Sequence, residues 1–394
     1  MDSSLGVYVH VPFCARICPY CDFAVEASRA EGEVWTVTED AYVDGLLAEL
    51  ALRRADFSGR SLASLYFGGG TPSLLRPDSL ARVREAVEKA FPPGPGPVEV
   101  TLEVNPSSIE RERLPAFRSE AGVGRLSVGV QSFDDSVLKA LGRAHEAGEC
   151  RRTLAAARDA GFENLSLDLM FAALHQTPAM LESDLAEALR FEPEHVSCYE
   201  LVFEAATPFG RAAARGRLPA FPEDESARML ETIEARLSAS GYRRYELTNY
   251  ARPGYESVHN RRYWQRRAVL GLGVGAHSTD PPAPGRPHGS RHANPRQRAA
   301  WSRAVASGEC PLGEEEVLDR RTAMAEACFL ALRCEEGLDP SGFEAEFGAS
   351  PRDAFGAVIE GFLGQGLLDE APGGRLRLSR RGRQLADTVC AGFV

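Results

Sequence analysis

The chain has 394 residues, which is long enough for a large domain and a small one. Hydrophobic residues make up 44% and charged residues 26%, a composition typical of a globular protein. Its formal net charge of −11 argues against a general nucleic-acid binder, and no apolar run reaches the ~18–20 residues that span a bilayer. The first residues carry neither a basic stretch nor a small-residue cleavage site, so we expect a cytoplasmic protein with reduced thiols.

Short apolar runs alternate with amphipathic segments over the first 240 residues. The apolar runs predict β-strands at residues 6–12, 62–68, 98–105, 125–131, 164–171 and 195–203. Helices are expected at residues 39–55, 77–91, 109–120, 134–160 with a break around Gly142–Gly148, 178–191 and 222–240. This alternation predicts parallel strands with right-handed crossovers. Six units are fewer than the eight of a closed barrel, so we predict an α/β fold with an open, partial (β/α)6 barrel over residues 1–240.

The pattern changes after residue 240. Residues 243–251, 255–264 and 268–278 lack long helices between them and predict an antiparallel or mixed extension of the sheet. A Pro- and Gly-rich loop follows at 280–295, and we expect this second unit to cover residues 241–312. Residues 313–394 predict a small helical, winged-helix-like domain with a β-hairpin around Gly373 and Gly374. The acidic chain disfavours DNA binding by this domain.

Polar residues and glycines gather at the carboxyl ends of the predicted strands, where parallel α/β folds bind ligands. They are Cys14, Cys18 and Cys21 after the first strand, Gly68, Gly69 and Gly70 after the second, Glu103 and Gln131 at the ends of the third and fourth, and Asp168 within the fifth. Glycines let backbone approach a ligand closely, carboxylates suit ribose hydroxyls, and Arg143 could bind a ligand carboxylate. Taken singly, Glu103 and Asp168 would be interpreted as hydrogen-bond partners that stabilise the fold. Together with the cysteines they predict one shared cofactor site.

The three clustered cysteines lie in 10-HVPFCARICPYCDFA-24, with the spacing C-x3-C-x2-C. A zinc site takes four protein ligands and would have to add His10, Asp22 or a distant cysteine. A four-iron cluster takes one thiolate per iron, so three cysteines would leave one iron open to an external molecule. The other six are scattered and expected to be small buried hydrophobes: Cys150, Cys198, Cys310, Cys328, Cys334 and Cys390.

The cysteine loop resembles that of the radical S-adenosylmethionine (SAM) superfamily. YVHVPFC, YFGGGTPS, LEVNP, LSVGVQSF and LGRAH follow one another as in its coproporphyrinogen III oxidase-like branch, and the likeness covers nearly the whole chain. The resemblance implies a [4Fe-4S] cluster on the three cysteines, SAM chelated to the open iron, and an electron donor that reduces the cluster. It implies a SAM shell made of Tyr8, Tyr20, Gly69, Gly70, Thr71, Glu103, Gln131, Arg143 and Asp168.

Two features favour the haem chaperones of that branch over its oxidases. The oxygen-independent oxidases carry a further cysteine where this chain has Phe23, and an N-terminal extension that we expect to be absent here. The segment 259-HNRRYW-264 is similar to the HN-x-x-YW motif of the chaperones, as are 271-GLGVGAHS-278, Arg291 and Asn294. The resemblance implies a carrier that passes haem to respiratory proteins, with docking at the inner membrane surface as an option. A coproporphyrinogen III oxidase, or a radical SAM enzyme with another substrate, is the alternative, so enzyme activity stays open.

His259 is the first candidate for haem contact, either directly or as an organiser of the site, with His277 and His10 behind it. Tyr263 and Trp264 follow at four and five residues, so we expect one of them to share the face of His259. Haem propionates would need cations, and the nearby candidates are Arg261, Arg262, Arg266 and Arg267.

One departure from the branch follows the Asp168 strand. The branch has a Gly-Leu-Pro-Gly-Gln-Thr-like turn there, whereas this chain has 171-FAALHQT-177. A turn that needs positive φ would be reshaped without its glycine. His175 is expected to face solvent.

Overall fold

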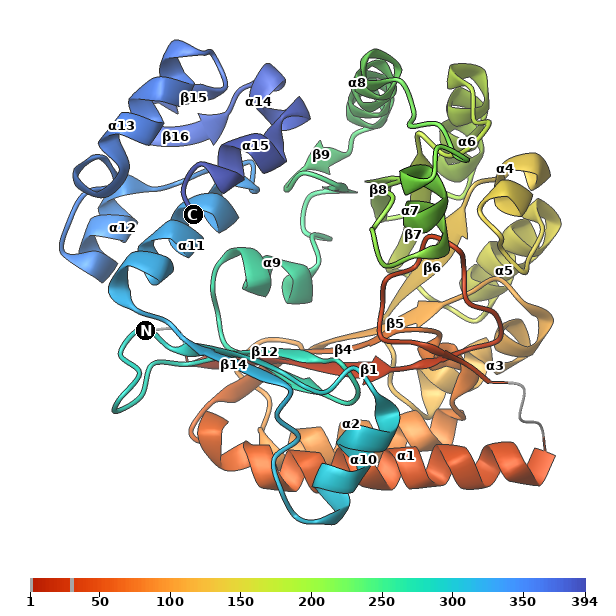
Figure 1. The fold of residues 1–394 in the computed structure, drawn as a ribbon. Helices are drawn as coiled ribbons and strands as arrows, with labels where there is room; N and C mark the ends of the chain where they lie inside the picture. The colour runs from red at the N-terminus through yellow and green to blue at the C-terminus, as the bar shows by residue number, and fades with distance from the viewer. Residues whose placement is uncertain (1–2, 29–31) are drawn as a thin grey trace.

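The computed structural model describes residues 3–28 and 32–394; the remaining residues of the predicted barrel unit, 1, 2 and 29–31, lie outside the described residues. One large sheet organises the molecule, with the strand order β14-β13-β12-β11-β1-β4-β5-β6-β7-β8-β10-β9. In chain order these strands are β1 (Ser4–Val11), β4 (Ser61–Gly69), β5 (Glu99–Val104), β6 (Arg125–Gln131), β7 (Leu165–Phe171), β8 (His195–Glu200), β9 (Arg243–Arg244), β10 (Asn249–Ala251), β11 (Val269–Leu272), β12 (His277–Asp280), β13 (Ser290–Ala293) and β14 (Glu314–Val317). Figure 1 shows the sheet curving from β1 and β4 at the bottom to β7 and β8 at the right.

The strands from β11 to β8 run parallel, which confirms the predicted α/β fold and its open, partial barrel. Helices cover the outer face of the sheet (Figure 1), as right-handed crossovers require. The barrel helices are α1 (Gly32–Arg53), α2 (Pro77–Ala90), α3 (Ser108–Ser119), α4 (Asp135–Ala140), α5 (Ala147–Asp159), α6 (Pro178–Arg190), α7 (Pro208–Ala214) and α8 (Glu223–Ala239), with 3-10 turns η1 (Arg54–Phe57) and η2 (Pro72–Leu74). The predicted helix at 134–160 is indeed broken, into α4 and α5.

The sheet extension differs from the prediction in two ways. First, its strands attach to both edges of the barrel sheet: β9 and β10 continue beyond β8, whereas β11, β12, β13 and β14 continue beyond β1. Second, the segment 255–264, expected as part of the extension, contains the helix α9 (Val258–Trp264). The unit boundaries at residues 240 and 312 stay predictions.

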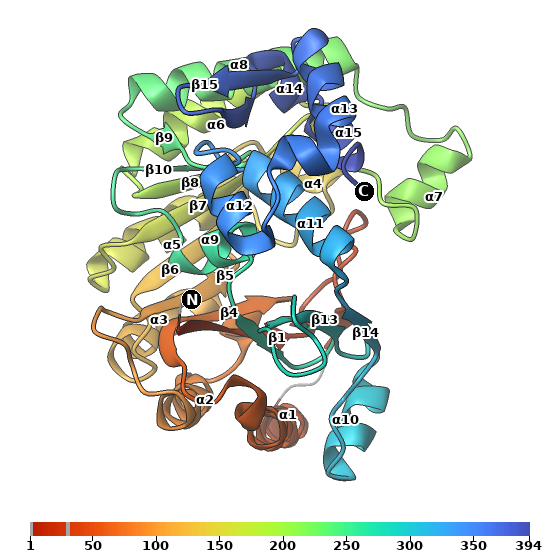
Figure 2. The ribbon, with the colours of Figure 1, turned by 90° about the vertical axis from the view of Figure 1, so that its left-hand side faces the viewer.

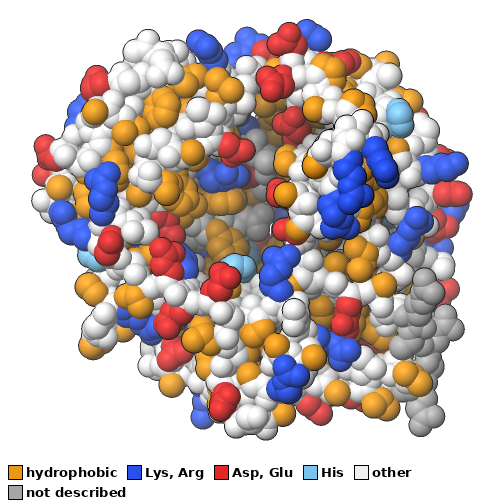
Figure 3. All heavy atoms as spheres, in the orientation of Figure 1, with side chains coloured by type: hydrophobic (Ala, Val, Ile, Leu, Met, Phe, Trp, Pro, Cys, Tyr) orange, Lys and Arg blue, Asp and Glu red, His pale blue; other side chains and the backbone are white. Residues whose placement is uncertain are grey.

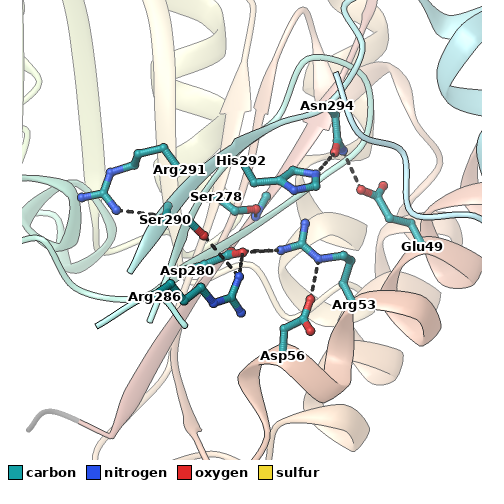
Figure 4. Close-up of polar contacts among 11 residues, drawn as sticks. Glu49, Arg53, Asp56, Ser278, Asp280, Arg286, Ser290, Arg291, His292 and Asn294 are labelled. Atoms are coloured by element: carbon teal, nitrogen blue, oxygen red, sulfur yellow. Dashed lines mark hydrogen bonds and ion pairs between the residues drawn. The ribbon is translucent and has the colours of Figure 1, made fainter. Parts of the chain in front are cut away.

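A buried polar network fastens the antiparallel extension to α1 (Figure 4). Arg53 donates to both carboxylate oxygens of Asp280 at 2.9 and 3.1 Å, and both side chains are almost fully buried. Glu49 accepts hydrogen bonds from the Gly273 amide and the Asn294 side chain. Because buried charges are stable only when paired, this network fixes where β12 and β13 sit against the barrel.

The C-terminal part has its own hydrophobic core, separate from that of the barrel. Its helices are α11 (Arg320–Leu332), α12 (Pro340–Phe347), α13 (Pro351–Gly364), α14 (Arg380–Gln384) and α15 (Ala386–Ala391), and its hairpin is β15 (Leu368–Ala371) with β16 (Arg375–Leu378). The preceding helix α10 (Arg298–Ala306) packs on α1 and belongs to the barrel core through Trp301 and Val305. Arg291 of β13 forms an ion pair with Glu326 of α11, so the extension and this part are linked. No helix in the described residues combines the length and the hydrophobicity that crossing a membrane requires.

Candidate functional site

The cysteine loop starts where β1 ends and lies beside the glycine-rich end of β4. The two short strands β2 (Phe13–Cys14) and β3 (Glu26–Ala27) pair at the base of the loop. Gly70 donates its amide hydrogen to the Val11 carbonyl at 2.8 Å. A Cβ at Gly70 would lie 2.7 Å from the Phe13 oxygen and 2.8 Å from the Cys14 sulfur, so only glycine fits this close approach.

A cavity of about 330 Å³ opens at the carboxyl ends of the parallel strands. It is lined by all three clustered cysteines and by most of the predicted SAM shell: Cys14, Cys18, Cys21, Tyr20, Gly69, Gly70, Thr71, Glu103, Gln131, Arg143 and Asp168. Figure 3 shows the same face of the molecule hollowed at its centre. The fold therefore brings these residues, which are spread over 155 positions of the sequence from 14 to 168, into one site.

Two carboxylates stand close together in this cavity. Glu103 accepts hydrogen bonds from the Tyr66 hydroxyl at 2.9 Å and the Gly69 amide at 3.1 Å, and Asp168 accepts from the Ser127 hydroxyl. Burial raises the pKa of Glu103 to about 7, and the neighbouring Asp168 adds to this shift. Burial likewise raises the pKa of Asp168. Both groups are held in place by neighbours, yet they face an open cavity.

Arg143 joins the cysteine loop to the rest of the cavity. Its guanidinium donates to the Asn105 side chain, to the Gly129 carbonyl at 3.3 Å and to the Cys18 sulfur at 3.5 Å. Its Nε–H is buried without a hydrogen-bond partner among the described residues. A buried donor of this kind normally has an acceptor, so this N–H is available to a ligand in the cavity.

The cavity fits an iron–sulfur cluster and SAM by its donor set. The three cysteines are free thiols on one loop, so each could supply one thiolate to an iron of the cluster. Thr71 and Arg143 donate to the sulfurs of Cys14 and Cys18, respectively. In the described residues no three His, Cys, Asp or Glu side chains converge closely enough to hold one single metal ion.

Tyr8 and His259 lie behind the cavity wall rather than in it. His259 is 1% exposed; its ring nitrogens are 2.9 Å from the Ser64 hydroxyl and 3.3 Å from the Tyr263 hydroxyl. Its ring centre lies 5.1 Å from that of Tyr66 and 6.1 Å from that of Tyr8. Burial lowers the pKa of His259 to about 3, so the imidazole is neutral at physiological pH. His259 therefore packs behind Tyr66 and does not line the cavity.

The helix α9 divides the HNRRYW motif between two sides. Tyr263 shares the buried side with His259, as one turn of helix requires, whereas Trp264 faces a second cleft of about 290 Å³ toward α11 and α12. The neighbour of His259, Asn260, lines the first cavity. The side chains of the motif therefore do not form one continuous surface on one side of α9.

The expected propionate cations already have partners. Arg262 is buried and donates to the Ser4 hydroxyl, the Ser4 carbonyl and the Ala268 carbonyl. Arg261 pairs with Glu336, and Arg266 pairs with Glu326 and Glu346. These ion pairs join α9 and the residues that follow it to the C-terminal part. Contact with haem propionates stays a prediction.

The turn after β7 keeps its positive φ without glycine. Ala172 has φ 53° and His175 has φ 65°, a conformation that non-glycine residues rarely adopt. His175 is exposed, as expected. Among the scattered cysteines, Cys150, Cys198 and Cys328 are buried as predicted and Cys334 and Cys390 are partly buried, but Cys310 is exposed, and the expectation was wrong for that residue.

Several cavity residues were missed by sequence reasoning. They are Tyr66, Asn105, Arg125, Ser127, Gly129, Ser197, Tyr199 and Asn260. Most of them stand two positions from another cavity residue on the same strand, as in Ser127, Gly129 and Gln131. Because alternate residues of a strand share a face, the period of two was the signal that could have found them.

The family model of the radical SAM superfamily matches residues 8–188, and that of the HemN C-terminal domain matches residues 318–385. Among solved structures, the coproporphyrinogen III oxidase HemN of Escherichia coli superposes with a TM-score of 0.82 and 24% identity, over 100% of this chain and 90% of that one. The fold and the cysteine-lined cavity thus define a radical SAM protein.

Curated relatives narrow the family. The heme chaperone HemW of Bacillus subtilis is 32% identical over 99% of both chains, and that of Lactococcus lactis is 32% identical over 99% of this chain and 97% of the relative. The mitochondrial radical S-adenosyl methionine domain-containing protein 1 of Mus musculus is 36% identical, over 93% of this chain and 82% of the relative. The chain belongs to the heme chaperone HemW family.

Proposed function

We propose that this protein binds haem and delivers it to haem-requiring respiratory proteins, while a [4Fe-4S] cluster and SAM occupy the barrel cavity. The observation that carries the proposal is likeness over the full length to proteins named heme chaperones, combined with Phe23 at the position of the oxidases' further cysteine. The site of action is proposed to be cytoplasmic, with docking at the inner membrane surface as an option.

Each part of the cavity has a role in holding the cofactors. Cys14, Cys18 and Cys21 would hold the cluster, which when bound supplies an electron to SAM. Arg143, with its unpartnered Nε–H, would bind the carboxylate of SAM. Asp168 and Glu103 would accept hydrogen bonds from its ribose hydroxyls and amino group.

The remaining predicted residues would complete this shell. Gly69, Gly70 and Thr71 would offer backbone and hydroxyl groups at the edge of β4, Gln131 would do so at the end of β6, and Tyr20 would cover the cluster loop. Tyr8 lies behind the cavity wall, so it would support the SAM site indirectly. Its hydroxyl forms a hydrogen bond with the His10 ring at 3.1 Å.

For haem, we propose that His259 organises the site. Its ring nitrogens bond to Ser64 and Tyr263, so axial ligation of haem iron would require α9 to move. It supports Tyr66, which in turn donates to Glu103, and thereby links the HNRRYW motif to the cofactor cavity. Asn260 extends the motif into that cavity.

The test is a haem titration run beside a decarboxylation assay on the same reconstituted protein. We expect roughly one haem per chain, seen as a Soret band, and no conversion of coproporphyrinogen III to protoporphyrinogen with SAM and a reductant. Robust decarboxylation without stoichiometric haem binding would make the oxidase alternative correct. Absence of both activities would favour a radical SAM enzyme with another substrate.

A further inference from the structure

A basic surface stands beside the cysteine loop of this acidic chain. Between Glu204 and Glu223 the sequence contains no acidic residue, but it contains Arg211, Arg215 and Arg217. All three are exposed, and none forms an ion pair with another residue that the structure describes. We call these three residues the α7 arginine patch. Figure 3 shows Lys and Arg side chains gathered over α7, next to the central hollow.

The patch is attached to the loop that carries the cluster cysteines. The amide of Phe209, in α7, donates to the Pro19 carbonyl at 3.0 Å. The rings of Phe209 and Tyr20 lie 6.4 Å apart. Pro19 and Tyr20 are the two residues between Cys18 and Cys21. Figure 2 shows α7 projecting from the body of the molecule, where a large partner could reach it.

We propose that the α7 arginine patch is the docking surface for an acidic protein that donates one electron to the cluster. This inference rests on the proposed cluster. The electron must come from outside the chain, and a donor seated on α7 would lie against the loop that holds the three thiolates. In the step, the donor loses one electron and the cluster gains one, with no proton or group transferred.

The charge distribution favours this partner. A net charge of −11 repels an acidic protein from most of the surface, so a local group of uncompensated arginines would steer it to α7. Redox encounters are transient and bury small areas, which suits a patch of three side chains. An anionic membrane is recruited by larger basic clusters, of about 4–8 residues, and is repelled by the same net charge.

The experiment compares two triple variants that change the net charge equally. One carries Arg211→Gln, Arg215→Gln and Arg217→Gln. The control carries Arg54→Gln, Arg243→Gln and Arg303→Gln, three exposed arginines of η1, β9 and α10 without an ion pair in the described structure. Bleaching of the cluster absorbance by reduced flavodoxin, an acidic flavoprotein, is followed anaerobically at low and high salt. Dithionite serves as a small reductant.

We expect the patch variant to be reduced by flavodoxin roughly 10-fold more slowly than wild type at low salt, and the difference to shrink as salt rises. The control variant should match wild type, and dithionite should reduce all three proteins alike. Titration of cluster-free protein with oxidised flavodoxin should show the same loss of affinity.

Equal flavodoxin rates and affinities in all three proteins would overturn the proposal. Loss of binding to phosphatidylglycerol vesicles in the patch variant, with flavodoxin behaviour unchanged, would overturn it in favour of a membrane surface. A protein that binds no iron and is not bleached by dithionite would instead contradict the proposed cluster. In that case the titration of cluster-free protein with flavodoxin would still test whether the α7 arginine patch binds an acidic protein.

Discussion

Replacing His259 by alanine tests whether this residue organises the cavity wall. In the folded protein its ring fills a buried space between Ser64, Tyr66 and Tyr263. The alanine variant would lose those contacts and leave the Ser64 and Tyr263 hydroxyls without their partner. We therefore expect both a less stable fold and weaker SAM binding, because Tyr66 also holds Glu103.

The size of the effect follows from burial and hydrogen bonding. Removing a buried ring from a packed core costs about 3–5 kcal/mol for the largest aromatic residues, and each hydroxyl left unpaired costs ~1–3 kcal/mol. For a ring as small as imidazole we expect the free energy of unfolding to fall by about 3–4 kcal/mol. If Tyr66 no longer holds Glu103 in position and the free energy of SAM binding falls by ~1 kcal/mol, the dissociation constant for SAM rises roughly fivefold.

The assay is urea unfolding of the cofactor-free protein, followed by tryptophan fluorescence and far-UV circular dichroism, because bound cofactors would add their own stabilisation. His259→Phe is the informative companion: it fills the space but leaves the same two hydroxyls unpaired, so it should lower the free energy of unfolding by less than His259→Ala does. His277→Ala, at the exposed start of β12, should stay within about 0.5 kcal/mol of wild type.

A His259→Ala protein as stable as wild type, with unchanged SAM affinity, would refute the organiser role. If its Soret band were nevertheless altered, His259 would have to reach haem directly, through a movement of α9.

Three further predictions follow from the site and the fold. After reconstitution, alanine variants of Cys14, Cys18 and Cys21 should each lose most of the bound iron. The control Cys150→Ala, which changes a buried cysteine outside the loop, should keep it, and equal loss there would contradict the three-cysteine cluster. Asp168→Asn should weaken SAM binding, measured by the spectrum of the reduced cluster, while iron content stays at the wild-type level; loss of iron would mean a structural role. Asp280→Ala should lower the free energy of unfolding by about 3–5 kcal/mol, because it leaves Arg53 buried without its main partner, and a change below 1 kcal/mol in urea unfolding would show that the pair is dispensable.

The fold class and the cofactor cavity followed from local patterns. Apolar strands that alternate with helices predict parallel pairing, and parallel pairing places the strand ends at one rim. The residues at those ends, from Cys14 to Asp168, therefore could be assigned to one site from the sequence alone. The period of two within each strand could also have identified most of the other lining residues, such as Ser127 and Gly129, but not Tyr66 or Asn260.

The HNRRYW motif shows what the sequence left open. A helix of one or two turns is unstable by itself, so local propensity does not decide its structure. The helix start combines a local cap with a distant partner. The Ser257 side chain accepts from the Asn260 amide, and the carboxylate of Glu99 in β5 accepts hydrogen bonds from the amides of Val258 and His259, across about 160 positions of sequence.

The sequence by itself determined the barrel, the three-cysteine loop and the rim of polar residues, because each depends on spacing along one segment or on the shared direction of parallel strands. Only the tertiary structure decided that His259 is buried behind Tyr66, that Trp264 faces another cleft, and that Arg262 is satisfied by Ser4. The physical reason is that burial and hydrogen-bond partners of a short element are set by the residues packed against it, and those residues come from distant parts of the chain.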